Sequence, residues 1–378
     1  MEIYLDNCAT TKVCQEAANA CMKVMTVEYG NPSSLHKKGL EAENILTDVR
    51  KSIGLILNGD PDCVLFTGGA TESNNLAILG GVSARKREGK TIVTTSVEHA
   101  SVENAVALLE QQGYTIKRVS PKADGNFDAA DFVAAVDDDT VLLTFMMVNN
   151  EIGTFLPYEK IVSGVRKKYP KLLIHMDAVQ GFTKFPLHMK KVDIDLLSFS
   201  GHKLYAPKGI GGLYLKKGVR IHPLLHGGGQ ERGLRSGTQS VPLIAAMGAA
   251  LTLCKEKNDL FFETYRSCNA YLRQALLKID GVVINSPENG SPHLLNFSIP
   301  GVPSEIMLHY LEQHEIYVSS GSACSKGAKS SVLEAYGFPT ERIISALRIS
   351  FSKDTTKEEL DCLIASLKQG IQKFKAII

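Results

Sequence analysis

Between residues 13 and 255, short runs of apolar and β-branched residues alternate with longer stretches whose apolar residues recur at helical spacing. This rhythm predicts a mainly parallel sheet with helices on both faces, because parallel strands need long, usually helical, crossovers. A chain of 378 residues with 44% hydrophobic residues can build a large core and about two domains. The expected strands are residues 63–67, 91–95, 141–145, 172–176 and 195–199.

The pattern changes after this region. Residues 255–278 form a charged amphipathic stretch, which predicts a helix, and shorter strands and helices follow toward the C-terminus. We therefore expect a large domain over residues 13–255 and a smaller α+β domain over residues 1–12 and 256–378.

Charge and hydropathy argue against nucleic-acid-binding, secreted and membrane-spanning proteins. The net charge is +2, and acidic and basic residues are interspersed, without the basic stripe that nucleic-acid binding requires. The first residues lack the basic and apolar regions of a secretory signal. The longest apolar stretch, residues 241–254, contains Pro242 and Gly248 and is too short to span a bilayer. We expect a cytoplasmic protein that acts on small substrates, without direct contact with nucleic acid or membrane.

The cysteines predict no metal site, and one of them lies in a reactive setting. Eight cysteines are present, and none forms a Cys-x-x-Cys pair or a zinc-finger spacing. Cys324 lies in a segment of small residues, 319–327, which predicts a flexible loop, and Lys326 nearby favours its thiolate. Such a loop could carry a nucleophilic sulfur into a pocket. The alternative is an inert small residue in a turn.

Polar clusters follow each expected strand, and the carboxyl ends of parallel strands meet at one edge of a sheet. Asp177 and Gln180 follow the fourth expected strand, and Ser200, His202 and Lys203 follow the fifth. A lysine amine forms Schiff bases with carbonyl cofactors, and an aspartate can keep a pyridine nitrogen protonated. These clusters predict a site for pyridoxal 5'-phosphate.

Two further clusters fit the same site. Residues 68–74 supply glycines and then open a helix, whose free amides and the Thr71 hydroxyl would bind a phosphate. The alternative is a helix cap formed by Thr71 or Ser73. His99 follows the second strand, where its ring could stack on a cofactor and share in proton transfer, or simply be a hydrogen-bonded residue.

Later segments could complete the pocket. Asn150 follows the third expected strand, and residues 226–238 are glycine-rich and basic, suited to a phosphate or a subunit contact. Arg348 interrupts an apolar run. Its guanidinium could clamp a substrate carboxylate or form a structural ion pair.

With these residues assembled, the sequence resembles the cysteine desulfurases, the NifS/IscS-like group of the class V aminotransferases, which are fold-type I pyridoxal phosphate enzymes. The similarity runs nearly end to end, through residues 4–11, 30–34, 69–73, 148–153, 198–203, 235–238 and 319–324. The resemblance implies a homodimer with a mainly parallel seven-stranded sheet flanked by helices. It also implies a smaller α+β domain that carries the catalytic cysteine.

The same resemblance implies a role for each site residue. Lys203 would form the Schiff base, Asp177 would bind the pyridine nitrogen, Gln180 the ring hydroxyl, and His99 would stack on the ring. Asn150 and Arg348 would hold L-cysteine. The cofactor phosphate would be bound by Ala70, Thr71, Ser200 and His202, with Thr238 of the partner subunit.

The implied reaction converts L-cysteine to alanine. Lys203 would move protons, and the thiolate of Cys324 would attack the substrate sulfur and become a persulfide. An acceptor protein, either an iron–sulfur cluster scaffold or a tRNA-thiolation protein, would then take the sulfur.

Two features depart from the family pattern, and other activities stay open. Cys8 stands where relatives usually have alanine or serine, and it could be filler or a second reactive sulfur. Residues 325–331 lack the proline often present there. A selenocysteine lyase or an aminotransferase could use the same scaffold, and a non-catalytic docking protein is a further alternative.

Overall fold

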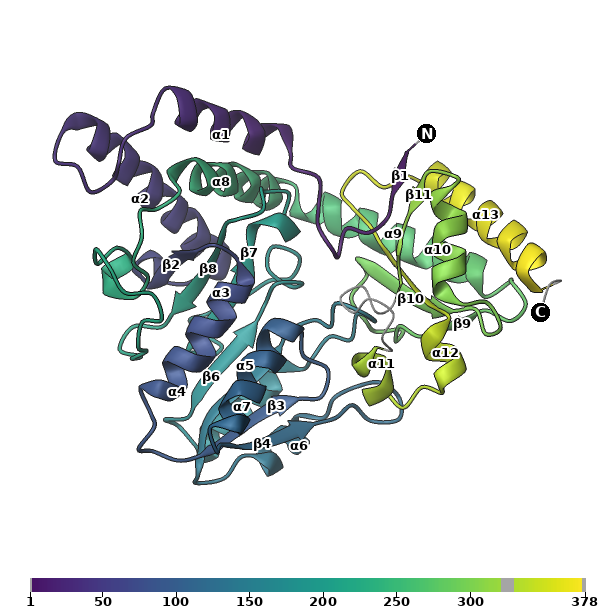
Figure 1. The fold of residues 1–378 in the computed structure, drawn as a ribbon, viewed down its shortest axis with the longest axis horizontal. Coiled ribbons are helices and arrows are strands. Elements are labelled where there is room, and N and C mark those ends of the chain that lie inside the picture. The colour runs from purple at the N-terminus through teal and green to yellow at the C-terminus, as the bar shows by residue number, and fades with distance from the viewer. Residues whose placement is uncertain (1, 321–329, 376–378) are drawn as a thin grey trace.

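The computed structural model describes residues 2–320 and 330–375. Its largest sheet has seven strands (Figure 1). The strand order is β2-β8-β7-β6-β5-β3-β4. Only β8 runs antiparallel to its neighbours, so the predicted mainly parallel sheet is confirmed. The strands are β2 (Val64–Thr67), β3 (Thr91–Thr95), β4 (Thr115–Val119), β5 (Thr140–Met146), β6 (Leu173–Asp177), β7 (Leu196–Ser200) and β8 (Gly211–Leu215).

Helices cover both faces of this sheet. Alternate strand residues point to opposite faces, so Ile92 and Leu142 lie in one apolar core, and Val93 and Leu143 lie in the other. The first core includes η2 (Leu76–Gly80), α4 (Gly81–Ser83) and α5 (Ala100–Gln111), and η2 is a π-helical turn that joins α3 (Ala70–Asn75) to α4. The second includes α1 (Gln15–Thr26), α2 (Lys37–Leu57), α6 (Ala129–Ala135), α7 (Tyr158–Lys168) and α8 (Val241–Glu256).

A second group of elements lies beside the large sheet, at the right of Figure 1. Its antiparallel sheet has the order β12-β13-β10-β9, and β1 pairs with β11 in parallel. The strands are β1 (Ile3–Tyr4), β9 (Val283–Ile284), β10 (Leu294–Ser298), β11 (Ile316–Tyr317), β12 (Ser319–Ser320) and β13 (Ala346–Ser350). The helices are α9 (Asn258–Leu276), α10 (Ser304–Glu312), α11 (Ser331–Ala335), α12 (Thr340–Ile344) and α13 (Lys357–Lys375).

The N-terminal segment is tied to this second group. Asp6 pairs with Ser350 in an isolated parallel bridge, and the Asn7 side chain donates a 2.9 Å hydrogen bond to the Ser350 carbonyl. The Cys8 amide donates to Ser350 Oγ over 2.8 Å. The start of the chain is therefore held against β13, at the edge of the large sheet.

Several boundaries differ slightly from the sequence-based expectation. The helix expected over residues 255–278 begins at Asn258, because the chain leaves helical geometry at Lys257, where α8 has just ended. The short helices η1 (Pro61–Cys63), η3 (Gly201–Lys203) and η4 (Glu231–Gly233) were not expected. Across residues 2–320 and 330–375, no helix is both long and apolar enough to cross a membrane.

Candidate active site

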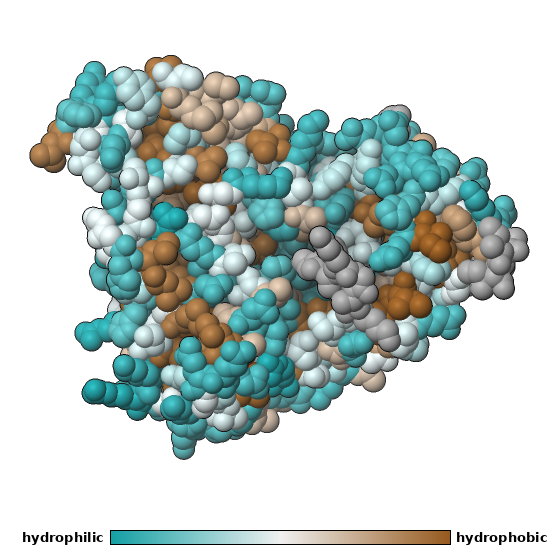
Figure 2. Space-filling model, in the orientation of Figure 1, coloured by the Kyte–Doolittle hydropathy of each residue, from teal (hydrophilic) through white to brown (hydrophobic). Residues whose placement is uncertain are grey.

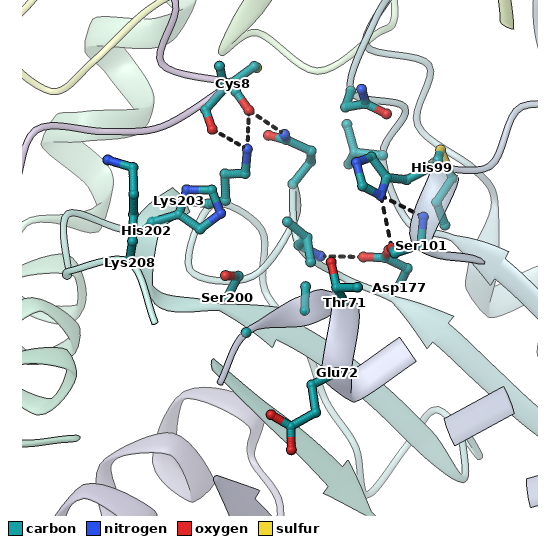
Figure 3. A pocket seen from close by; sticks show the side chains of 18 of the residues that line it. Cys8, Thr71, Glu72, His99, Ser101, Asp177, Ser200, His202, Lys203 and Lys208 are labelled. Carbon is teal, nitrogen blue, oxygen red and sulfur yellow. Dashed lines mark hydrogen bonds between the residues drawn. The ribbon is translucent and has the colours of Figure 1, made fainter. Parts of the chain in front are cut away.

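A cavity of about 890 Å³ lies beyond the carboxyl ends of the parallel strands, where the polar clusters were expected to meet (Figure 3). The clusters after β2, β3, β5, β6 and β7 all contribute to its wall, together with the N-terminal segment and β13. The expected convergence is therefore confirmed. The predicted site residues that line it are Ala70, Thr71, His99, Asn150, Asp177, Gln180, Ser200, His202, Lys203 and Arg348.

Lys203 ends η3, directly after β7, and its amine is held by main-chain oxygens. Nζ donates hydrogen bonds to the carbonyls of Cys8, at 2.5 Å, and Ala9, at 2.6 Å. Burial of the amine lowers the pKa of Lys203 to about 8, and the positive charges of Arg348 and Lys184 act in the same direction. A lysine with such a pKa has a substantial neutral fraction near neutrality, which a Schiff-base nucleophile needs.

Asp177 ends β6 and brings a buried carboxyl group to the cavity. Oδ2 accepts a 2.8 Å hydrogen bond from Asn74 Nδ2, and Oδ1 accepts one of 2.9 Å from the Val179 amide. Gln180 is buried beside it. Its Nε2 donates to the Cys8 carbonyl over 3.1 Å, and its Oε1 lies 3.1 Å from His293 Nε2. Both side chains are therefore fixed before any ligand binds.

The glycine segment before α3 forms an open cradle. Gly69 has φ 147°, a conformation that favours glycine, and a Cβ built there would have only Ser200 Oγ near it, at 3.9 Å. The predicted alternative of a Thr71 or Ser73 cap is wrong, because Gly69 is the N-cap residue and Ser73 bonds Thr67 Oγ1 instead, at 2.7 Å. The Thr71 side chain is left to face the cavity.

His99 and His202 flank the cavity from opposite sides (Figure 3). His99 is the N-cap of α5, where its Nδ1 accepts from the Ser101 amide over 3.1 Å. It is therefore hydrogen-bonded, as one alternative proposed, and it also lines the pocket. Burial lowers the pKa of His99, and burial lowers that of His202 to about 4. Both rings are neutral near pH 7.

Arg348 forms the structural ion pair that one alternative predicted, and it also lines the cavity. Nη2 forms an ion pair with Asp6 Oδ1 at 2.7 Å, and Nη1 donates to the Asn150 carbonyl over 2.9 Å. Its buried Nε has no partner in the described part of the chain. Arg348 lines the cavity, and the two hydrogen bonds of Nη1 and Nη2 leave further N–H groups of the guanidinium for an anionic ligand.

Among the described residues, one predicted site residue is not brought to this cavity. Thr238 is exposed in the segment before α8 and does not line the cavity of its own chain. Cys324 lies outside the described residues. Cys8 does reach the cavity, and burial raises the pKa of its thiol, which favours the inert form.

Several cavity residues had no predicted role. Glu72 and Glu151 lie in the segments 68–74 and 148–153, where only neighbouring residues have predicted roles, and Ser101 and Lys208 belong to no predicted cluster. Glu72 accepts from the Gly68 amide, at 2.7 Å, and pairs with Arg235 at 2.7 Å. A carboxylate at the third position of a helix that follows a glycine turn typically stabilises the helix N-terminus. This pattern could have identified Glu72.

The donor set fits pyridoxal phosphate. A half-buried lysine of lowered pKa, a buried carboxyl group and a glycine-lined helix start face one cavity, as that cofactor's aldehyde, pyridine nitrogen and phosphate require. The described residues contain no group of three or more histidine, cysteine or acidic side chains arranged to hold a metal ion.

Comparison with known proteins decides the family. A model described as aminotransferase class V matches residues 3–363. The chain belongs to the class V aminotransferase family. Membership implies pyridoxal phosphate as the cofactor, in agreement with the residues of the cavity.

Relatives cover this class V chain almost completely. It is 41% identical over 384 residues to a NifS/IcsS protein homolog of Lactobacillus delbrueckii subsp. bulgaricus, covering 99% of this chain and 98% of that protein. It is 37% identical over 380 residues to the cysteine desulfurase IscS of Dictyoglomus turgidum, covering 100% and 96%. A solved NifS-like protein superposes with a TM-score of 0.94 at 34% identity, covering 99% of this chain and 100% of that one.

Proposed function

We propose that this class V protein is a cysteine desulfurase that converts L-cysteine to L-alanine and transfers the sulfur to Cys324. The observation that carries the proposal is that Lys203, the buried Asp177 carboxyl and Arg348 line one cavity. The similarity to a named cysteine desulfurase over the whole chain supports the same activity.

The residues present would hold the cofactor and substrate as follows. Lys203 would bind the aldehyde, Asp177 the pyridine nitrogen, and Gln180 the ring hydroxyl. When bound, pyridoxal phosphate supplies an electron sink for a carbanion. The phosphate would be bound by Ala70, Thr71, Ser200 and His202, with Thr238 of the partner subunit.

The guanidinium of Arg348 is the natural partner for the substrate carboxylate, with Asn150 beside it. Asp6 and the Asn150 carbonyl restrain the guanidinium, so little side-chain entropy would be lost when the substrate binds. The neutral form of Lys203 can accept a proton from the substrate, and its protonated form can return one.

Sulfur transfer would be carried by Cys324. Its thiolate would form an S–S bond to the substrate sulfur while the C–S bond breaks. The electron pair of that bond would stay on carbon, which takes up a proton to give alanine. The persulfide on Cys324 would then be passed to a thiol of an acceptor protein.

Four finer points belong to the same proposal. The protein would be a homodimer, its acceptor an iron–sulfur cluster scaffold or a tRNA-thiolation protein, and its location cytoplasmic. Residues 13–255 would form the cofactor-binding domain, and residues 1–12 and 256–378 the domain that bears Cys324. The attachment of residues 3–8 to β11 and β13 supports that division.

The test is the release of sulfide and alanine from L-cysteine in the presence of a thiol reductant. Equal molar amounts are expected from the native protein and from Cys362→Ser, because Cys362 is exposed on α13. Cys324→Ser should release neither. Products that survive in Cys324→Ser would favour a lyase, and product formation only with a keto acid would favour an aminotransferase.

A further inference from the structure

A chain of hydrogen bonds links Asp177 to His99 through Asn74 and Ser101, and we propose that it fixes the proton of neutral His99 on Nε2. Asn74 and Ser101 are thereby assigned as positioning residues. The position of this proton follows from hydrogen bonds within the protein, whereas the role of His99 in catalysis rests on the proposed function.

The carboxyl group of Asp177 determines which atom donates in each of these hydrogen bonds. Asn74 Nδ2 lies 2.8 Å from Asp177 Oδ2. Turning the Asn74 amide around would place its Oδ1 against a carboxylate oxygen, and neither atom could donate. The NH2 group of Asn74 must therefore face Asp177.

The Ser101 hydroxyl group connects Asn74 to His99. The second hydrogen of Asn74 Nδ2 points to Ser101 Oγ, 2.9 Å away, so this hydroxyl oxygen is an acceptor. Its single hydrogen is then left for His99 Nδ1, at 2.8 Å. The Ser101 amide also donates to Nδ1, over 3.1 Å, as the two dashed lines in Figure 3 show. A ring nitrogen that accepts from two donors carries no proton.

The proton of the neutral ring therefore lies on Nε2. Within residues 2–320 and 330–375, Nε2 has no hydrogen-bond partner, and His99 lines the cavity. Burial and the positive charge of Lys203 lower the pKa of His99, and the charge of Asp177 opposes them. The neutral ring presents an N–H donor to the cavity.

This assignment divides the proton chemistry between two residues. A nitrogen that already carries a proton cannot accept one, and Nδ1 is turned toward Ser101. His99 consequently orients the ligand as a hydrogen-bond donor, and Lys203 is the base. Asn74 and Ser101 act through His99. Replacing Ser101 should therefore change the protonation of the His99 ring nitrogens while the fold is retained.

The direct test is ¹⁵N NMR of histidine-labelled, full-length protein as purified, with the His99 signals assigned from the His99→Gln spectrum. We expect an unprotonated Nδ1 and a protonated Nε2. Ser101→Ala should shift the Nδ1 signal, because Nδ1 loses one of its two donors. Ser101→Thr keeps a hydroxyl and should retain the native signals, as should Ser163→Ala, a change at an exposed serine on α7. A proton on Nδ1 of the native protein, or an unchanged Nδ1 signal in Ser101→Ala, overturns the proposal.

The kinetic consequence is tested separately. In Ser101→Ala, kcat for L-cysteine should fall about three- to tenfold, the effect of losing one hydrogen bond, with little change in KM. Ser101→Thr should recover most of the native rate. If the protein releases no sulfide at all, the proposed function fails, and the spectrum of the native protein alone still decides the tautomer.

Discussion

The guanidinium of Arg348 lies 2.7 Å from the carboxylate of Asp6, a residue more than 300 positions earlier in the chain. This ion pair occupies Nη2, and the Asn150 carbonyl occupies Nη1. The planar group is thus held in one orientation. Such restraint favours recognition of a carboxylate by geometry as well as by charge.

Arg348→Lys should raise KM for L-cysteine about 10- to 100-fold, because an ammonium cannot keep both fixed contacts and still reach the substrate. The measurement is steady-state alanine release across a range of L-cysteine concentrations. Arg342→Lys is the control, since Arg342 is partly buried and does not line the cavity, and its guanidinium donates to Asn285 and to the Ile284 carbonyl. A KM in Arg348→Lys close to the native value would contradict this role.

The lowered pKa of Lys203 should be visible in the full-length protein after its cofactor is removed. The rate of reductive methylation of the Lys203 amine should reach half its maximum near pH 8, where burial sets its pKa. Exposed lysines should keep gaining reactivity beyond about pH 10. Mass spectrometry of proteolytic peptides measures the methylation of Lys203 and of the exposed lysines in one sample. A Lys203 profile that follows the exposed lysines would refute the electrostatic account.

Glu151 should make stability depend on pH. Burial raises the pKa of its carboxyl from 4.5 to about 7, while a 2.6 Å hydrogen bond from Ser330 opposes the shift. The folded protein therefore holds this proton more tightly than the unfolded chain, and the resulting stability is lost as the pH rises from about 4.5 to about 7. Glu151→Gln has no carboxyl proton to release at this position, so its stability does not fall for this reason as the pH rises.

The free energy of unfolding of Glu151→Gln, relative to native, should consequently increase across that interval and then level off. Urea unfolding from about pH 5 to about pH 8 measures the difference. Glu305→Gln, at an exposed position of α10, should show no such trend. A flat difference for Glu151→Gln would mean that its carboxyl is ionised throughout.

Gly211→Ala should distort the glycine segment before α3, which we propose binds the cofactor phosphate. A Cβ at Gly211 would lie 2.8 Å from Gly69 Cα and 2.7 Å from the Phe199 carbonyl, both main-chain atoms that cannot move aside cheaply. We expect a loss of about 1–3 kcal/mol in stability and weaker binding of pyridoxal phosphate. Calorimetry and a cofactor titration measure these effects. Gly164→Ala meets only the end of the Val133 side chain, so native cofactor affinity is expected there.

The sequence predicted the large sheet well but missed two of its strands, for physical reasons. Residues 115–119, which form the edge strand β4, include Lys117 and Arg118 and so lack an apolar run. Residues 211–215 begin with two glycines, which weaken a strand signal, yet Gly212 fits against the Phe199 ring of the neighbouring strand. The expected strands, by contrast, are buried on both faces and read as continuous apolar runs.

Most cavity residues could be predicted because each follows a strand, but their contacts could not. No local pattern indicates that Asn74 bonds Ser101, or that Asp6 meets Arg348, since such pairs depend on three-dimensional packing. The main-chain oxygens of Cys8 and Ala9 bind Lys203 whatever their side chains are, so side-chain patterns carry no signal for them.

The attachment of residues 6–8 to Ser350 has a consequence for synthesis of the protein. A ribosome releases residue 6 long before residue 350, so the large sheet can fold while one wall of the cavity is still missing. Until β13 emerges, Asp6 has no Arg348 to pair with. The cavity is therefore completed only near the end of translation, and a nascent chain that stalls before β13 lacks the guanidinium that would bind an amino acid.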